Sequence, residues 1–211
     1  MKHLLTLTLL CFGLLAQAQI PSYVPTNGLV GWWPFNGNAN DESGNGNHGT
    51  MNGATLAADR FGNAGKAYSF DGISSFIQFP CNITTNTTTA SVWFKSNSNG
   101  FQSIIDNDIA PLYGNNIILN YANSGNKIDL LFHDGVFRTN ATFQINSIYH
   151  AVAVWNDSNC KLYLNGVLVD SFAHATGFNE RNIYRLGKHS SNSAFFLGII
   201  DDVALYNRAL S

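Results

Sequence analysis

Charge of either sign is scarce in this chain. Asp, Glu, Lys and Arg together make up 11 % of its 211 residues, against about 25 % in an ordinary soluble domain. The formal net charge is −2, and lysine and arginine form no run anywhere in the sequence. Binding to nucleic acid or to an acidic membrane surface depends on such basic clusters. We therefore expect no nucleic-acid partner.

Glutamate is especially rare, and this bears on catalysis. The sequence has only Glu42 and Glu180, each in a turn-rich stretch, whereas glycan hydrolysis needs two carboxylates about 5–9.5 Å apart. Asp201 and Asp202 are adjacent in an expected strand, so their side chains are predicted to point to opposite faces. The sequence also lacks a Gly-x-Ser-x-Gly elbow and the ligand spacing of a zinc site. These absences predict no catalytic residues and a protein that is not an enzyme.

Long apolar segments are absent beyond the N-terminus. The apolar run Leu4–Leu15 follows Lys2 and precedes Ala16-Gln17-Ala18. It is too short to span a bilayer comfortably and has the form of a secretory signal peptide with an A-x-A cleavage site. We predict that residues 1–18 are a signal peptide, and that the protein is secreted or held at the cell surface without membrane insertion.

Cysteine is also scarce. The chain has three cysteines, and removal of the signal peptide would leave Cys81 and Cys160. In an oxidising compartment such a pair can form a disulfide. The alternative is two independent thiols, because the sequence does not show whether the two Cα atoms approach within about 7 Å.

Short apolar runs separated by turn residues are abundant. Hydrophobic residues make up 45 % of the chain and alternate with polar ones over short stretches, without a helical period. The expected strands are 29–35, 67–70, 76–79, 90–95, 101–106, 116–121, 127–133, 150–156, 161–164, 167–172, 184–187 and 198–207. Asn165-Gly166 is the strongest hairpin signal, because a type I′ turn requires positive φ at both central residues. The pattern predicts an all-β, two-sheet sandwich over residues 27–211, after a short extended lead-in at 19–26.

The tryptophans indicate where the core lies. Trp32, Trp93 and Trp155 each stand in an alternating strand, so we expect them to pack in the core or between the sheets. Successive side chains of a strand point to opposite faces, so Trp33 is predicted to lie on the face opposite Trp32. One of these two neighbouring rings can therefore be exposed.

Three groups of segments carry a known pattern in the same order along the chain. They are Gly28–Ala39 with Asp41–Gly49 and Ser69–Gly72; Tyr149–Trp155 with Lys161–Val169; and Leu186–Lys188 with Gly198–Ser211. In these segments the chain resembles the laminin-G-like jelly-roll domain of the concanavalin A-like lectin/glucanase superfamily, in the form common in secreted bacterial proteins. The resemblance covers about residues 27–211 and implies an antiparallel jelly roll. The chain departs from the family at Asn36, where Asp is frequent, and at Tyr149, where Trp is frequent.

The resemblance also implies a possible calcium site. Domains of this superfamily often tie an N-terminal loop to the last strand through one structural calcium ion, and the matching residues here are Asp41, Asn45 and Asp201. Calcium takes six to eight oxygen ligands, which flexible loops rich in Asn and Gly supply readily. The alternative is that Asp41 and its Asn-Gly loop build Asx turns, and that Asp201 accepts hydrogen bonds at the end of a strand.

Residues for ligand binding are expected in loops. A ring exposed at a loop tip can stack on a sugar while neighbouring polar groups bind its hydroxyls. The candidates are Tyr113, Phe137, Arg138, Phe178 and Phe195. The alternative for each ring is packing beneath its loop.

The resemblance implies a binding function more than an activity. We expect a secreted, non-catalytic module for a carbohydrate or glycan. The alternatives are a module that binds an extracellular protein and a structural spacer of a larger surface protein. A glycan-cleaving enzyme is less favoured, because related glucanases carry Glu-x-Asp-x-x-Glu, which this chain lacks. The chain ends directly after the last expected strand, which suggests further domains downstream.

Overall fold

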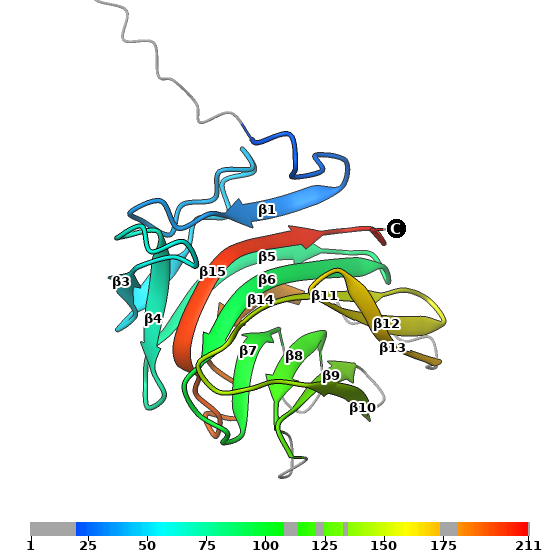
Figure 1. Ribbon diagram of the computed structural model, residues 1–211. Helices are drawn as coiled ribbons and strands as arrows, with labels where there is room; N and C mark the ends of the chain where they lie inside the picture. The colour runs from blue at the N-terminus through cyan, green and yellow to red at the C-terminus, as the bar shows by residue number, and fades with distance from the viewer. Residues whose placement is uncertain (1–19, 108–113, 121–124, 133–134, 174–180, 211) are drawn as a thin grey trace, which may run out of the picture.

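Two antiparallel β-sheets form the molecule. The computed structural model describes residues 20–107, 114–120, 125–132, 135–173 and 181–210. Within these ranges the sheets pack face to face and no helix is present (Figure 1). It follows that no helix of the described residues is long and apolar enough to cross a membrane. The predicted all-β jelly-roll sandwich is confirmed.

The first sheet, here called sheet A, has eight strands and is centred on the long last strand, β15 (Leu197–Tyr206). On one side of β15 lie, in order, β6 (Thr88–Ser96), β11 (Ile148–Trp155), β12 (Asn159–Leu164) and β13 (Val167–Ala173). On its other side lie β1 (Leu29–Trp33) and β4 (Ala67–Asp71), with β3 (Thr55–Ala57) beyond β4. The first and last described strands are therefore paired.

The second sheet, sheet B, has seven strands that cover one face of sheet A. Their order is β10 (Gly135–Thr142), β9 (Lys127–Phe132), β8 (Asn116–Leu119), β7 (Gln102–Asp106), β14 (Arg181–Leu186), β5 (Phe76–Ile83) and β2 (Thr50–Asn52). Every expected strand overlaps a strand of the structure, but β2, β3 and β10 were not expected. β2 and β3 are short and mostly exposed, and β10 carries few apolar residues. Their period-two signal is correspondingly weak.

Alternate residues of each strand fill the core between the sheets. On β6, Val92 and Phe94 point inward and are buried, while Ser91 and Trp93 between them are half-buried on the other face. Trp33 and Trp155 are fully buried in this core, as the pattern predicts for Trp155. This alternation leaves sheet A with a second face, which sheet B does not cover.

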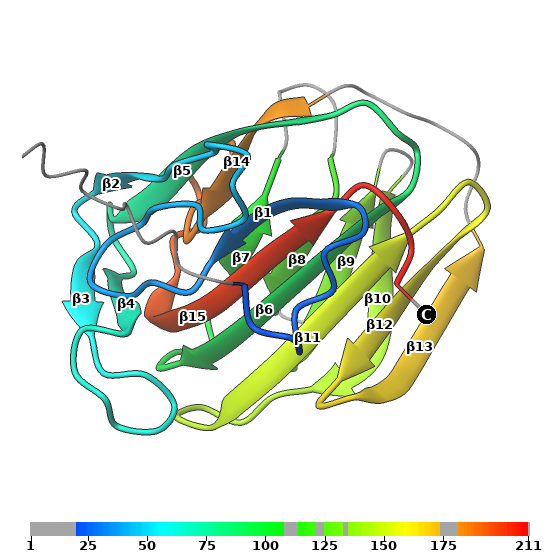
Figure 2. The same cartoon turned by 90° about the horizontal axis from the view of Figure 1, so that it is seen from above.

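A smaller apolar cluster lies on that second, outer face of sheet A. Trp32 packs there with Ala204 and Tyr206, beneath Val24 of the segment that leads into β1. Seen from above, this segment crosses in front of the sheet (Figure 2). The N-terminal segment therefore covers part of the outer face and leaves the rest open.

The predicted hairpin at Asn165-Gly166 is confirmed. It joins β12 to β13, and both residues have positive φ, 50° and 81°, as a type I′ turn requires.

Cys81 and Cys160 are both buried and are not joined by the disulfide considered from the sequence. Cys81 lies on β5, near one end of sheet B, and Cys160 lies on β12, near one end of sheet A. β12 and β13 lie at one end of sheet A, and this end packs against β10. In sheet B, β10 is at the opposite end from β5 and β2. The strand order thus separates the two thiols across the sandwich.

Candidate ligand-binding groove on the outer face of sheet A

Trp93 and His150 form the floor of an open groove on the outer face of sheet A. They are register partners on β6 and β11, and their rings stack with centroids 4.7 Å apart and planes at 14°. His150 Nε2 lies 2.8 Å from Ser91 Oγ, which holds the imidazole flat against the sheet. The expectation that Trp93 lies in the core is wrong, because its strand neighbours Val92 and Phe94 take the inward positions.

A β-bulge in β15 brings two carboxylates to this face. The register with β6 shifts between Asp201 and Ala204, and Asp202 has a φ of 40°. A bulge places two residues opposite one on the partner strand and re-aims their side chains. Asp201 and Asp202 therefore both reach one nitrogen of Arg60, at 2.8 and 2.7 Å. The prediction that they point to opposite faces is wrong, since it assumed a regular strand.

Arg60 comes from the loop between β3 and β4 and lies across the floor of the groove. Its guanidinium carbon is 4.5 Å from the centroid of the Trp93 ring and 4.6 Å from that of Phe61. A cation over an aromatic face gains electrostatic stabilisation. The guanidinium is thus held by two rings and two carboxylates.

The loop that carries Arg60 is held by its own hydrogen bonds. The Asp59 carboxylate accepts the backbone N–H groups of Phe61 and Asn63 and the side-chain amide of Asn63. These bonds keep the pKa of Asp59 below its ordinary value, although burial acts against them. A turn closed in this way presents Arg60 and Phe61 in a fixed orientation.

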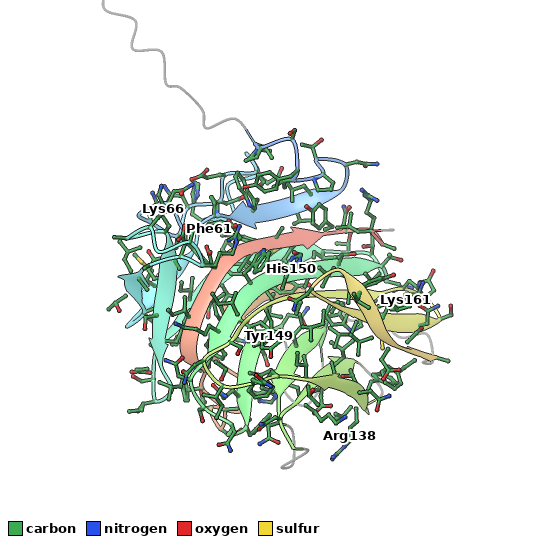
Figure 3. The ribbon with its side chains drawn as sticks, viewed as in Figure 1. Phe61, Lys66, Arg138, Tyr149, His150 and Lys161 are labelled. Atoms are coloured by element: carbon green, nitrogen blue, oxygen red, sulfur yellow. The ribbon has the colours of Figure 1, made fainter. Side chains whose placement is uncertain are left out.

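Exposed aromatic rings stand at the edges of the groove. Phe61 is 74 % exposed and Tyr23, from the N-terminal segment, is 71 % exposed. A hollow of about 730 Å³ extends from Arg60 and Phe61 across the floor to the Asn165-Gly166 turn. A second hollow of about 350 Å³ continues from Arg60 beneath Tyr23. Figure 3 shows Phe61 and His150 on this side of the molecule.

The pKa values of Asp201 and His150 determine the charge of the groove near neutral pH. Burial, and then the charge of Asp202, raise the pKa of Asp201 to about 6, against the opposing effect of Arg60. Burial and the charge of Arg60 lower the pKa of His150. At neutral pH the imidazole is therefore uncharged, and Arg60 is the cation that lies against the floor.

The loop residues expected to bind a ligand do not line this groove. Phe137 and Arg138 lie on β10 and not in a loop; Phe137 is half-buried with its ring 5.6 Å from that of Phe172, and Arg138 lies well away from His150 (Figure 3). Phe195 is half-buried beside Lys188. Tyr113 and Phe178 lie outside the described residues. Ligand binding by these residues stays a prediction.

The residues proposed for calcium do not form one set of ligands. The Asp41 carboxylate accepts the backbone N–H groups of Trp32, Ser43 and Asn47, while Asp201 is paired with Arg60. Asn45 donates its side-chain amide to backbone carbonyls of β1. In the described part of the chain no group of three or more His, Cys, Asp or Glu could hold a metal ion. The contacts of Asp41 match its Asx-turn alternative, and calcium binding stays a prediction.

Sequence reasoning missed Arg60, Phe61 and Tyr23. The stretch Asp59-Arg60-Phe61-Gly62-Asn63 is a turn sequence that carries an arginine beside an aromatic ring, and this was the available signal. That the loop folds over Trp93, more than thirty residues later, depends on the pairing of β3, β4, β15 and β6.

The strand order and the packing of the two sheets define a jelly-roll β-sandwich. A sequence profile described as the concanavalin A-like lectin/glucanases superfamily matches residues 70–211. The chain belongs to this family, in its laminin-G-like branch. No curated protein sequence matches the chain significantly.

Solved structures share the fold at low sequence identity. Domain 4 of AbnA, a GH43 extracellular arabinanase from Geobacillus stearothermophilus, solved with arabinotriose, is 21 % identical with a TM-score of 0.67, over 87 % of this chain and 94 % of that one. The receptor-binding domain of botulinum neurotoxin C/D mosaic serotype is 15 % identical with a TM-score of 0.68, over 89 % of this chain and 49 % of that one. Trypanosoma rangeli sialidase with the inhibitor DANA is 14 % identical with a TM-score of 0.67, over 89 % of this chain and 32 % of that one. The chain thus spans half or less of the last two.

Proposed function

We propose that this protein is a secreted, non-catalytic module that binds a carbohydrate in the groove over Trp93. The observation that carries the proposal is the exposed Phe61 ring, which stands beside Arg60 at the edge of a polar and aromatic groove. Buried aromatic floors with a few directed polar groups are typical of small-ligand sites. A ring that is 74 % exposed leaves most of its apolar surface in water, and stacking on a sugar would remove that surface from water.

The polar groups around the groove suit hydroxyl groups. Asp202 is half-buried and retains carboxylate oxygens that can accept hydrogen bonds, and the exposed Asn165 side chain stands on the opposite side. Sugar hydroxyls donate to such acceptors. Structures of the same fold include one solved with arabinotriose and a botulinum binding domain in complex with SialylT, which supports a glycan as the class of ligand.

The test is binding to a panel of immobilised polysaccharides, with the strongest ligand then titrated by calorimetry. Phe61→Ala is expected to weaken binding by roughly tenfold or more, because hot-spot aromatic rings contribute most of the binding energy at such sites. Ile73→Ala is the matched control, since Ile73 is 76 % exposed and lines none of the hollows around Arg60.

Two outcomes would contradict carbohydrate binding in the groove. One is equal binding by Phe61→Ala and wild type, which would place the ligand elsewhere on the molecule. The other is retention of an extracellular protein with no retention of any polysaccharide, which would favour an adhesion module. Turnover of a bound glycan would contradict the non-catalytic part.

A further inference from the structure

Arg60 has an arrangement that bears on which glycans the groove accepts. Among the described residues that line the hollow between Phe61 and Asn165, Arg60 carries a full charge at neutral pH. An arginine in a sugar-binding groove ordinarily suits a ligand carboxylate, which it can bind in a bidentate manner. Here the guanidinium already has anionic partners.

The partners of Arg60 come from the protein itself. Asp201 Oδ2 and Asp202 Oδ2 both lie within 2.8 Å of the same Arg60 nitrogen. The side chains are shielded from water, with exposed fractions of 17 % for Arg60, 6 % for Asp201 and 18 % for Asp202. Ion pairs that are shielded in this way are costly to break from one side. A ligand carboxylate would have to displace one of them or add a third negative charge.

We propose that the Asp201-Asp202 bulge determines specificity by occupying Arg60, so that the groove selects neutral glycans and rejects glycans that bear carboxylates. This inference rests on the proposed function of the groove. One guanidinium and two carboxylates sum to a single negative charge behind the ligand position. A uronate is repelled by that charge, whereas the hydroxyls of a neutral sugar can donate to the oxygen atoms of Asp202 that remain accessible.

Two lysines near the groove do not replace Arg60. Lys66 lines a neighbouring hollow, where its ammonium donates to Asn36 Oδ1 at 2.8 Å. Lys95, the register partner of Ile148, lines a small hollow that also borders Arg60 and Asp201. Neither is among the residues that line the hollow between Phe61 and the turn, so neither presents its ammonium at the ligand position proposed there.

The experiment compares pairs of oligosaccharides that differ only in oxidation at C6. β-1,4-Mannotetraose is compared with β-1,4-tetramannuronate, and cellotetraose with its C6-carboxylate form, by calorimetry against the whole protein at pH 7.5 and low salt. Wild type is expected to bind each neutral member at least about tenfold more tightly than its uronate, from one unit charge in a partly shielded site.

Asp202→Asn tests the residue directly. The change removes one negative charge beside Arg60 and is expected to strengthen uronate binding about five- to tenfold. Neutral binding is expected to weaken, because an amide oxygen accepts the sugar hydroxyls less strongly than a carboxylate, so the preference for the neutral sugar narrows. Asp157→Asn is the matched control, because it makes the same change at an exposed turn between β11 and β12. Thermal melts of both variants check that they fold.

The wild-type comparison needs no variant, so it decides the inference even if Asp202→Asn does not fold. Uronate binding by wild type that equals or exceeds neutral binding would overturn the inference and leave glycan binding intact. An unchanged preference in a folded Asp202→Asn would also overturn it. Failure of every panel polysaccharide to bind would instead overturn the proposed function and the inference with it.

Discussion

The two faces of sheet A are built from the same strands and serve different purposes. The inner face carries Val92 and Phe94 on β6, both buried against sheet B. The outer face carries Trp93 and Ser91 from the same strand, beside His150 of β11. The inner face is held by apolar packing, whereas the outer face is held by stacking, ion pairs and short loops. The difference shows that an aromatic residue in an alternating strand need not belong to the core.

The largest expected effect separates the two faces by stability. Phe94→Ala is expected to lower the free energy of unfolding by about 3–5 kcal/mol, because it removes a buried ring and leaves a cavity. Trp93→Ala is expected to cost only about 1 kcal/mol, since it loses stacking on a half-buried surface. Urea denaturation of both variants measures this. Equal losses would show that the outer face is as much a part of the core as the inner one.

The next prediction concerns how the contribution of Asp201 to the free energy of unfolding changes with pH. Its pKa is raised to about 6 in the folded protein by burial and by Asp202, so the folded state binds this proton more tightly than the unfolded state. Its contribution therefore stabilises the fold most below the unfolded pKa, about 3.9, and is lost as pH rises through 6, by up to about 1–3 kcal/mol. The lowered pKa of His150 acts in the opposite direction near the same pH.

Asp201→Asn isolates that contribution. The difference in unfolding free energy between variant and wild type, measured in urea from pH 4.5 to 8, is expected to shift in favour of the variant as pH rises. Asp157→Asn, at an exposed turn, should follow wild type throughout. A constant difference between Asp201→Asn and wild type would show that Asp201 titrates normally.

A smaller effect is expected at the hairpin that borders the groove. Gly166 has a φ of 81° with open space where a Cβ would stand, so Gly166→Ala adds backbone strain without a clash. We expect a loss of about 1 kcal/mol, which lowers the melting temperature by a few degrees. Gly166→Asn, which tolerates positive φ better, should lose less. The opposite order would indicate that the turn changes type.

Redox conditions should have almost no effect. Cys81 and Cys160 are buried in the core and are not bridged to each other. Burial raises the pKa of Cys81 to about 12, which keeps the reactive thiolate scarce. Melting temperatures with and without reductant are expected to agree within about 1 °C. A clear drop on reduction would mean that the two thiols are bridged in solution.

Calcium is expected to have the smallest effect, because Asp41 and Asp201 are already bound to backbone N–H groups and to Arg60. A ligand that binds only the folded state raises its stability by mass action. Thermal melts in millimolar calcium and in chelator should therefore coincide. A higher melting midpoint in calcium would show that the folded protein binds the ion, and these carboxylates would then have to rearrange around it.

The sequence by itself determined the fold class, most strands and the hairpin at Asn165-Gly166. These follow from local rules, since period-two alternation marks a strand and positive φ marks a tight turn. The ordered motifs from Gly28 onward likewise identified the family, which the profile match to residues 70–211 confirms. Local rules also place Trp155 correctly, because its inward position follows from its own strand.

The tertiary structure decided the groove. Asp201 and Asp202 share a face because β15 has a bulge where it pairs with β6. The sequence of β15 gives no clear signal of this bulge, since its residue pattern is that of a regular strand. Trp93 faces outward because Val92 and Phe94 fill the inner positions, and Arg60 lies over it because β3 and β4 join the same sheet. Side-chain direction and long-range pairing are set by contacts between distant segments, and no local pattern records them.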